Sequence, residues 1–187
     1  MSKPFTHRRV ASGYSFQYGT AHARDLVDRA GELGMAALAL TDRDGMAGVI
    51  RFVQACESAD IKPIVGVNLS FLQKKFRITL LAQGGHLDSL YRLLSAVHLN
   101  NEENLLTHDL LEKFAQYSKN LLVLHGPESP LAAAITARRS SAGLSIYNST
   151  RDLFADQALE CVSPQIRGTG AFSTSHAGKL LAFAGRS

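Results

Sequence analysis

The segment Thr41-Asp42-Arg43-Asp44-Gly45 carries side chains whose types and spacing suit a chemical site. It follows residues 36–40, an apolar run of small side chains typical of a buried strand. In a parallel α/β barrel the polar residues at the C-terminal ends of the strands meet at one end of the barrel, where these folds have their functional sites. A carboxylate there is a metal ligand, whereas the guanidinium of Arg43 cannot be deprotonated and cannot coordinate a cation. The segment therefore combines one residue that suits a metal site with one that opposes it.

Histidines and cysteines, the other common metal ligands, show no ligand spacing. The seven histidines form no H-x-H or H-x3-H pair, so each is more simply a surface, capping or core residue. His125 is the best placed of them, because it ends a predicted strand. Cys56 lies on the apolar face of a predicted helix and is expected to be a buried thiol, and no disulfide with Cys161 is expected.

Short apolar runs alternate along the chain with amphipathic segments of helical period. This alternation predicts an α/β fold with a parallel sheet, helical crossovers and barrel-like closure. Residues 163–187 are interpreted as a Gly/Ser/Thr-rich loop followed by a short helix. The predicted strands are residues 36–40, 64–72, 76–82, 121–124 and 158–162, and the predicted helices are residues 23–33, 46–59, 87–99, 108–118, 131–139, 140–156 and 176–184.

Three continuous stretches carry a family resemblance: AGELGMAALALTDRDGMAGVIRF, IKPIVGVNL and LLSAVHLNNEENLLTHDLLEKF. With them the chain resembles the PHP (polymerase and histidinol phosphatase) domain at the N-terminus of bacterial DNA polymerase III alpha subunits, in particular the error-prone type. The resemblance implies a PHP-type (β/α) TIM-like barrel over residues 1–162, with residues 163–187 as a truncated continuation. The last ligand strand of the family, D-x-H, has no counterpart before Ser187, so the barrel is expected to be incomplete, with an unpaired strand edge that favours self-association.

The metal-binding positions implied by the resemblance are occupied by residues that do not suit a metal. The histidines of H-x-H fall at Arg9 and Ala11, and the histidine of T-D-H falls at Arg43. Asp42 is the one position that matches a ligand. The full set of vestigial positions is Arg9, Ala11, Tyr18, Asp42, Arg43, Asn68, Arg77 and Pro127. Because a multinuclear site needs several deprotonated ligands, we expect no bound metal, no cofactor and no catalysis from this chain alone.

The arginines at three former ligand positions have two interpretations. The first is neutral substitution at a metal site that is no longer under selection. The second is an anion-binding pocket in which Arg9, Arg43 and Arg77 converge, because a guanidinium binds phosphate through two parallel hydrogen bonds. The function implied by the resemblance is a metal-free scaffold in DNA replication or repair synthesis. The alternatives are a metal-dependent phosphoesterase of the PHP family and a phosphate-binding module. Whether the chain is a fragment, a decayed copy or an independent module stays open.

Charge is concentrated at the two ends of the chain. The net charge is +4, of which residues 1–24 contribute +4 and residues 161–187 contribute +3, neither with any acid. DNA is therefore a candidate partner through the basic termini, beside the palm and thumb of a polymerase or other replication and repair proteins. Phe5, Tyr14, Phe16 and Tyr18 interleave with Arg8 and Arg9, a pattern explained by strand packing or by single-strand binding. No long apolar run or secretory signal is present, so no membrane partner and a cytoplasmic location are expected.

Overall fold

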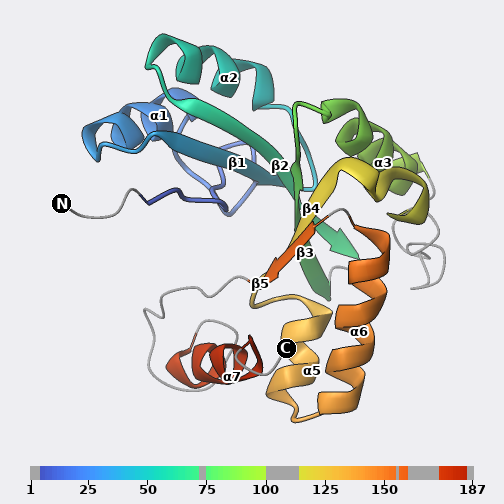
Figure 1. The fold of residues 1–187 in the computed structure, drawn as a ribbon. Coiled ribbons are helices and arrows are strands. Elements are labelled where there is room, and N and C mark those ends of the chain that lie inside the picture. The colour runs from blue at the N-terminus through green and yellow to red at the C-terminus, as the bar shows by residue number, and fades with distance from the viewer. Residues whose placement is uncertain (1–4, 72–74, 100–113, 155, 160–172, 185–187) are drawn as a thin grey trace.

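Residues 5–71, 75–99, 114–154, 156–159 and 173–184 are described by the structure, a computed structural model (Figure 1). Five strands in this part of the chain form one sheet, and their order in the sheet is their order in the sequence. The strands are β1 (Ala37–Arg43), β2 (Lys62–Phe71), β3 (Phe76–Ala82), β4 (Leu121–His125) and β5 (Asp156–Leu159). All five lie within a few residues of strands predicted from the sequence.

The strand directions differ from the prediction of a parallel sheet, which is wrong. The β1–β2 and β4–β5 pairs are parallel, whereas β3 runs antiparallel to both β2 and β4. The physical reason is the connection: only four residues separate β2 from β3, and a parallel pair needs a crossover of a dozen or more. Within the described residues the sheet is open, and its end strands β1 and β5 do not pair with each other.

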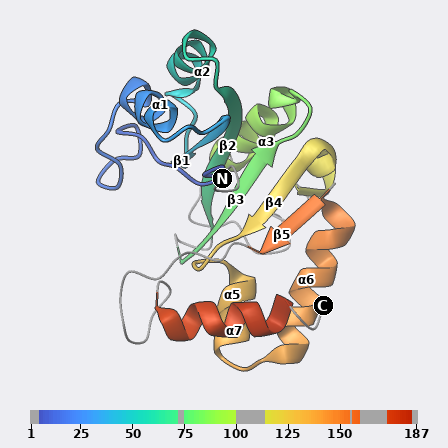
Figure 2. The same cartoon turned by 60° about the vertical axis from the view of Figure 1, so that its left-hand side comes forward.

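Helices form two groups at opposite ends of the sheet (Figures 1 and 2). The first group is α1 (Ala23–Glu32), α2 (Val49–Ser58) and α3 (Leu87–Leu99). The second is α5 (Pro130–Thr136), α6 (Ser140–Leu153) and α7 (Thr174–Ala184). Most of the helix predicted over residues 108–118 lies outside the described residues. No helix in the described part of the chain is both long enough and apolar enough to cross a membrane.

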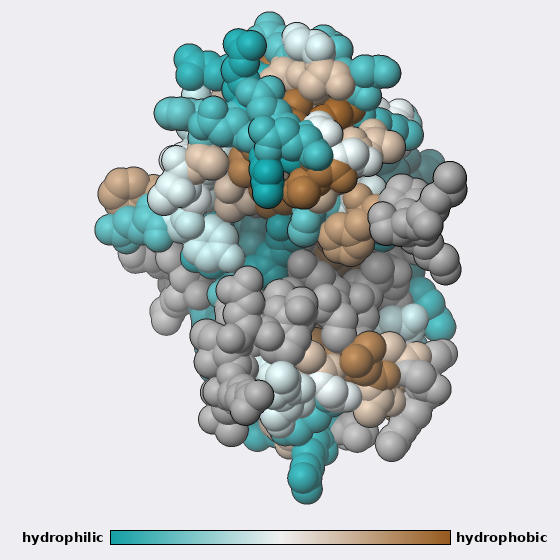
Figure 3. Space-filling view, turned by 90° about the vertical axis from the view of Figure 1, so that its left-hand side faces the viewer, coloured by the Kyte–Doolittle hydropathy of each residue, from teal (hydrophilic) through white to brown (hydrophobic). Residues whose placement is uncertain are grey.

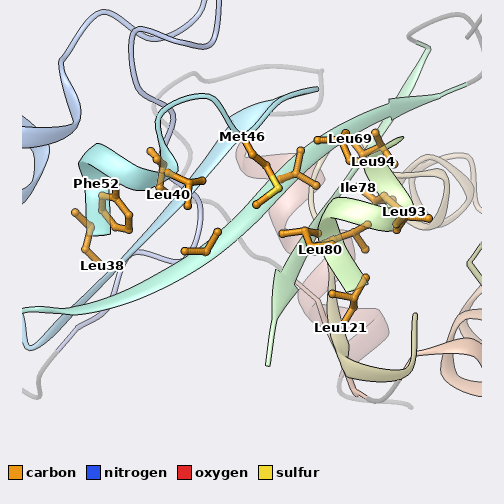
Figure 4. Packing of buried hydrophobic residues seen from close by; sticks show 14 of the residues in the cluster. Leu38, Leu40, Met46, Phe52, Leu69, Ile78, Leu80, Leu93, Leu94 and Leu121 are labelled. Carbon is orange, nitrogen blue, oxygen red and sulfur yellow. The ribbon is translucent and has the colours of Figure 1, made fainter. Parts of the chain in front are cut away.

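The main core lies between the sheet and the first helix group (Figure 4). Leu38 and Leu40 point from β1 toward Phe52 of α2, and Leu80 of β3 lies close to Leu93 of α3. All five side chains are almost completely buried. Alternate residues of a strand share one face, so the apolar residues of β1, β2 and β3 line the same side of the sheet. Asp42 shares the core-side face of β1 with these leucines, at the end of the strand.

An extended N-terminal segment covers the outer edge of β1. The amide of Ala39 donates to the carbonyl of His7 (2.9 Å), and the amide of Thr41 donates to the carbonyl of Val10 (2.7 Å). The segment therefore runs along β1 and brings Arg9 to the end of that strand. At the other end of the sheet, β5 lies at an edge with no further partner strand among the described residues.

Two potentially reactive side chains are buried in the interior. Burial raises the pKa of the Cys56 thiol to about 11, and the thiol is free, as the sequence predicted for this residue. His176 of α7 lies 2.9 Å (Nδ1) from the hydroxyl of Thr136 at the end of α5. Burial and the nearby ammonium of Lys179 lower the pKa of His176, so this histidine is a neutral helix-packing residue.

Candidate functional site

The buried carboxylate of Asp42 is held by a loop that follows the N-terminal segment. Only 2% of Asp42 is exposed. Its Oδ1 accepts hydrogen bonds from the amide of Ser12 (2.7 Å) and the hydroxyl of Ser15 (2.6 Å). Its Oδ2 accepts from the hydroxyl of Ser12 (2.8 Å). Because the protein itself supplies three donors, the carboxylate has the partners that a buried anion requires without any metal.

Ser15 and Gly48 fix the surroundings of this carboxylate. The hydroxyl of Ser15 accepts from the amide of Arg43 (2.9 Å), so the loop is also tied to the end of β1. A Cβ at Gly48 would lie 2.8 Å from the ring of Tyr14 and 3.2 Å from Oδ2 of Asp42. A larger residue at position 48 would therefore force the loop away from Asp42.

Arg9 and Arg43 meet at a carboxylate that the sequence analysis did not identify, Glu128. Nη2 of Arg9 donates to Oε2 of Glu128 at 3.0 Å, across 119 residues of sequence. Nη2 of Arg43 lies 3.8 Å from Oε1 of the same carboxylate. The guanidinium of Arg43 also stacks on the ring of Tyr18, with 3.5 Å between its central carbon and the ring centroid. Glu128 therefore lies where two arginines would otherwise repel each other.

Arg77 is neutralised separately, by Asp44. Its Nη2 donates to Oδ2 of Asp44 (2.8 Å) and to the carbonyl of Asn68 (2.9 Å), and its Nε donates to Oδ1 of Asn68 (3.1 Å). Oδ1 of Asp44 accepts from the amide of Ser70 (2.6 Å). Asp44 adopts a left-handed backbone (φ 53°) that turns its carboxylate back toward β2 and β3. Asp44 therefore contacts β2 and β3 and does not belong to the first turn of α2, which begins at Val49.

The other positions that the resemblance matched to metal ligands lie close to these pairs. Ala11 is half-buried beside Ser12, and Pro127 is buried in the turn that follows β4 and carries Glu128. The main-chain amide of Arg77 donates to the carbonyl of Glu128 (3.0 Å), which links the start of β3 to this turn. His125, the best-placed histidine of the sequence, is buried beneath the same turn, with its Nε2 3.2 Å from the hydroxyl of Thr150.

A metal ion of the kind that the family resemblance implies does not fit these residues. No group of three or more His, Cys, Asp or Glu side chains in the described residues could hold one. The carboxylate of Asp42 accepts three hydrogen bonds, and those of Asp44 and Glu128 are paired with arginines. Formal charges balance within the cluster, which consists of Arg9, Arg43, Arg77, Asp42, Asp44 and Glu128.

Sequence reasoning missed Glu128 of this cluster and the two serines that donate to Asp42, Ser12 and Ser15. The serines follow closely after Arg9 and Ala11, the two positions that the resemblance matched to metal ligands, and this closeness was a signal that they could lie near Asp42. Glu128 follows a predicted strand, as site residues do, but no local pattern indicates which arginine it would pair with.

Comparisons with known proteins show which family this chain resembles. The family described as PHP domain matches residues 7–163. The error-prone DNA polymerase of Symbiobacterium thermophilum is 41% identical over 100 residues, which are 52% of this chain and 9% of that protein. The DNA polymerase III subunit alpha of Buchnera aphidicola is 32% identical over 152 residues, 75% of this chain and 13% of that protein. This chain therefore spans a small part of the length of these relatives.

A solved structure shares the fold at low sequence identity. It is a protein of Bifidobacterium adolescentis provisionally assigned as a metal-dependent phosphoesterase, with a TM-score of 0.55 and 12% identity. The match covers 98% of this chain and 85% of that one. At this identity the similarity concerns the fold alone.

Proposed function

Because the chain belongs to the PHP domain family, we propose that it serves a DNA polymerase III alpha-type polymerase as a metal-independent scaffold in replication or repair synthesis. The observation that carries this proposal is the pairing of Arg9 and Arg43 with Glu128 and of Arg77 with Asp44. These pairs bridge the N-terminal segment, the end of β1, the start of β3 and the turn after β4. The cluster therefore supplies the cross-links that ligands around a shared metal would supply.

The partners that we propose are the other domains of such a polymerase, palm and thumb, because the relatives are much longer chains. We also propose that the open sheet is an incomplete PHP-type barrel whose edge at β5 is free to be extended by a further strand. DNA contact through the basic termini remains part of the proposal. Three of the seven basic residues in those two ends, Lys3, Arg167 and Arg186, lie outside the described residues.

The scaffold proposal predicts that the protein lacks phosphoesterase activity. Hydrolysis of a nitrophenyl phosphate in the presence of manganese or zinc should not exceed that of the Asp42→Asn variant purified in the same way. The reason is that a hydrolytic metal site needs open, deprotonated ligands, and these carboxylates are already occupied. Metal-dependent hydrolysis by the wild-type protein that Asp42→Asn lacks would refute the scaffold and support the phosphoesterase alternative.

Anion binding by the arginine cluster is the second candidate. One observation favours it: Nε of Arg43 is buried and makes no hydrogen bond among the described residues. Against it, Glu128 and Asp44 already neutralise the guanidiniums, so an incoming phosphate would have to displace a carboxylate. A rise in melting temperature with sulfate that Arg43→Ala abolishes would favour this candidate over the scaffold alone.

A further inference from the structure

An aromatic loop projects from the molecule just beyond the Asp42 carboxylate. Tyr14, Phe16 and Tyr18 are 42%, 85% and 48% exposed. The sequence left strand packing and single-strand binding open for these side chains. Packing does not explain Phe16, because its ring lies almost wholly in solvent. It explains only one side of each tyrosine ring, since Tyr14 lies against Gly48 and Tyr18 against the guanidinium of Arg43.

The loop that carries these aromatic residues is held rigidly. The three hydrogen bonds from Ser12 and Ser15 to Asp42 fix its start, and the amide of Gly13 donates to the carbonyl of Ala21 (2.8 Å) across its base. The chain passes so closely that a Cβ at Gly19 would lie 2.1 Å from the carbonyl oxygen of Ser12. The exposed rings are therefore presented in a preorganised arrangement, which lowers the entropic cost of binding.

A groove lined by two arginines, Arg24 and Arg51, and by the carboxylate of Asp28 adjoins the loop. It has a volume of about 470 Å³ and lies between the loop, α1 and α2, with Tyr14 in its wall. Arg51 is exposed and has no ion-pair partner in the described part of the chain, and Nε of Arg24 lies 4.0 Å from its nearest carboxylate, Asp28. Figure 3 shows hydrophilic side chains gathered over the upper part of this side of the molecule, with separate hydrophobic patches below them.

We propose that the aromatic loop and this groove bind single-stranded DNA. Exposed rings offer stacking faces to unpaired bases, and the arginines of the groove offer cations to the phosphates between them. One side of the Tyr18 ring is backed by the Arg43 guanidinium, which leaves the other side for a base. Duplex DNA hides its bases within the stack, so the surface selects single strands. This inference does not depend on the loss of the metal, and it places DNA on the loop of residues 12–19 and on the groove beside it.

The test is fluorescence anisotropy of a labelled oligothymidylate, with a duplex of the same length as competitor. The wild-type protein should prefer the single strand, and Phe16→Ala should weaken binding about tenfold or more, as stacked aromatic residues do. Arg51→Ala should weaken binding and reduce the slope of log affinity against log salt concentration by about one. The control is Tyr91→Ala, because Tyr91 is an exposed aromatic residue (42%, as Tyr14 is) that lies on α3, and this variant should bind as the wild type does.

The result that would overturn the proposal is undetectable binding, equal affinity for duplex, or affinity that Phe16→Ala leaves unchanged. Undetectable binding would point to a protein partner for the aromatic loop, whereas the other two results would show that the protein binds DNA without stacking of bases on this loop. Circular dichroism should give the same melting temperature for Phe16→Ala and wild type, because the ring makes little internal contact. Phosphoesterase assays do not test DNA binding, so the single-strand proposal and the scaffold proposal can fail independently of each other.

Discussion

Replacing Asp42 by alanine should lower the free energy of unfolding by about 3–5 kcal/mol, because three buried donors from Ser12 and Ser15 would lose their acceptor. The loop of residues 12–19 would lose its main attachment to β1 at the same time. Urea denaturation followed by circular dichroism measures the effect. If Asp42 were instead a metal ligand kept open for function, its removal would leave the stability of the metal-free protein unchanged or raise it.

The matched control for this variant is Asp28→Ala on α1. The Asp28 carboxylate is exposed and lies 4.0 Å from Arg24, so its removal should change the free energy of unfolding by less than about 0.5 kcal/mol. A loss for Asp42→Ala within that same range would contradict the structural role of the carboxylate.

Replacing Asp44 by asparagine should cost about 3 kcal/mol, because the buried guanidinium of Arg77 would lose its neutralising partner. Asparagine is the suitable replacement, since it tolerates the left-handed backbone of this position and keeps an acceptor for the amide of Ser70. Only 9% of the Arg77 side chain is exposed, so solvent cannot replace the lost carboxylate. Urea denaturation again provides the measurement.

The double variant Asp44→Asn/Arg77→Met separates the ion pair from general disruption. Removing both charges leaves no uncompensated guanidinium, so the double variant should be more stable than Asp44→Asn alone. An equal or larger loss in the double variant would show that the two side chains do not act as a pair.

The positions of the helices and strands could be predicted from the sequence because each element has its own pattern of apolar residues. The period of the apolar residues located α1, α3 and β3 within a residue or two. The prediction of the direction of β3 was wrong because it assumed that a helix joins each strand to the next. Among the described helices, none lies between β2 and β3. A connection of four residues, from Phe71 to Phe76, would have corrected it.

The sequence analysis named Arg9, Arg43 and Arg77 as possible members of one anion-binding pocket, but it identified no carboxylate of the protein as their partner. Like charges that lie close together need an anion between them. Glu128 meets that requirement for Arg9 and Arg43, and Asp44 meets it for Arg77. Partners 119 residues apart in the chain are set by tertiary packing, which no local pattern records.

The metal content of the purified protein tests the central claim most directly, namely that arginine–carboxylate pairs stand where a metal would be bound. The protein would be equilibrated with zinc and manganese, dialysed against metal-free buffer and subjected to elemental analysis. The paired carboxylates predict that tightly held metal stays well below one equivalent per chain. Two or more equivalents retained by the wild type and lost in Asp42→Asn would contradict the claim.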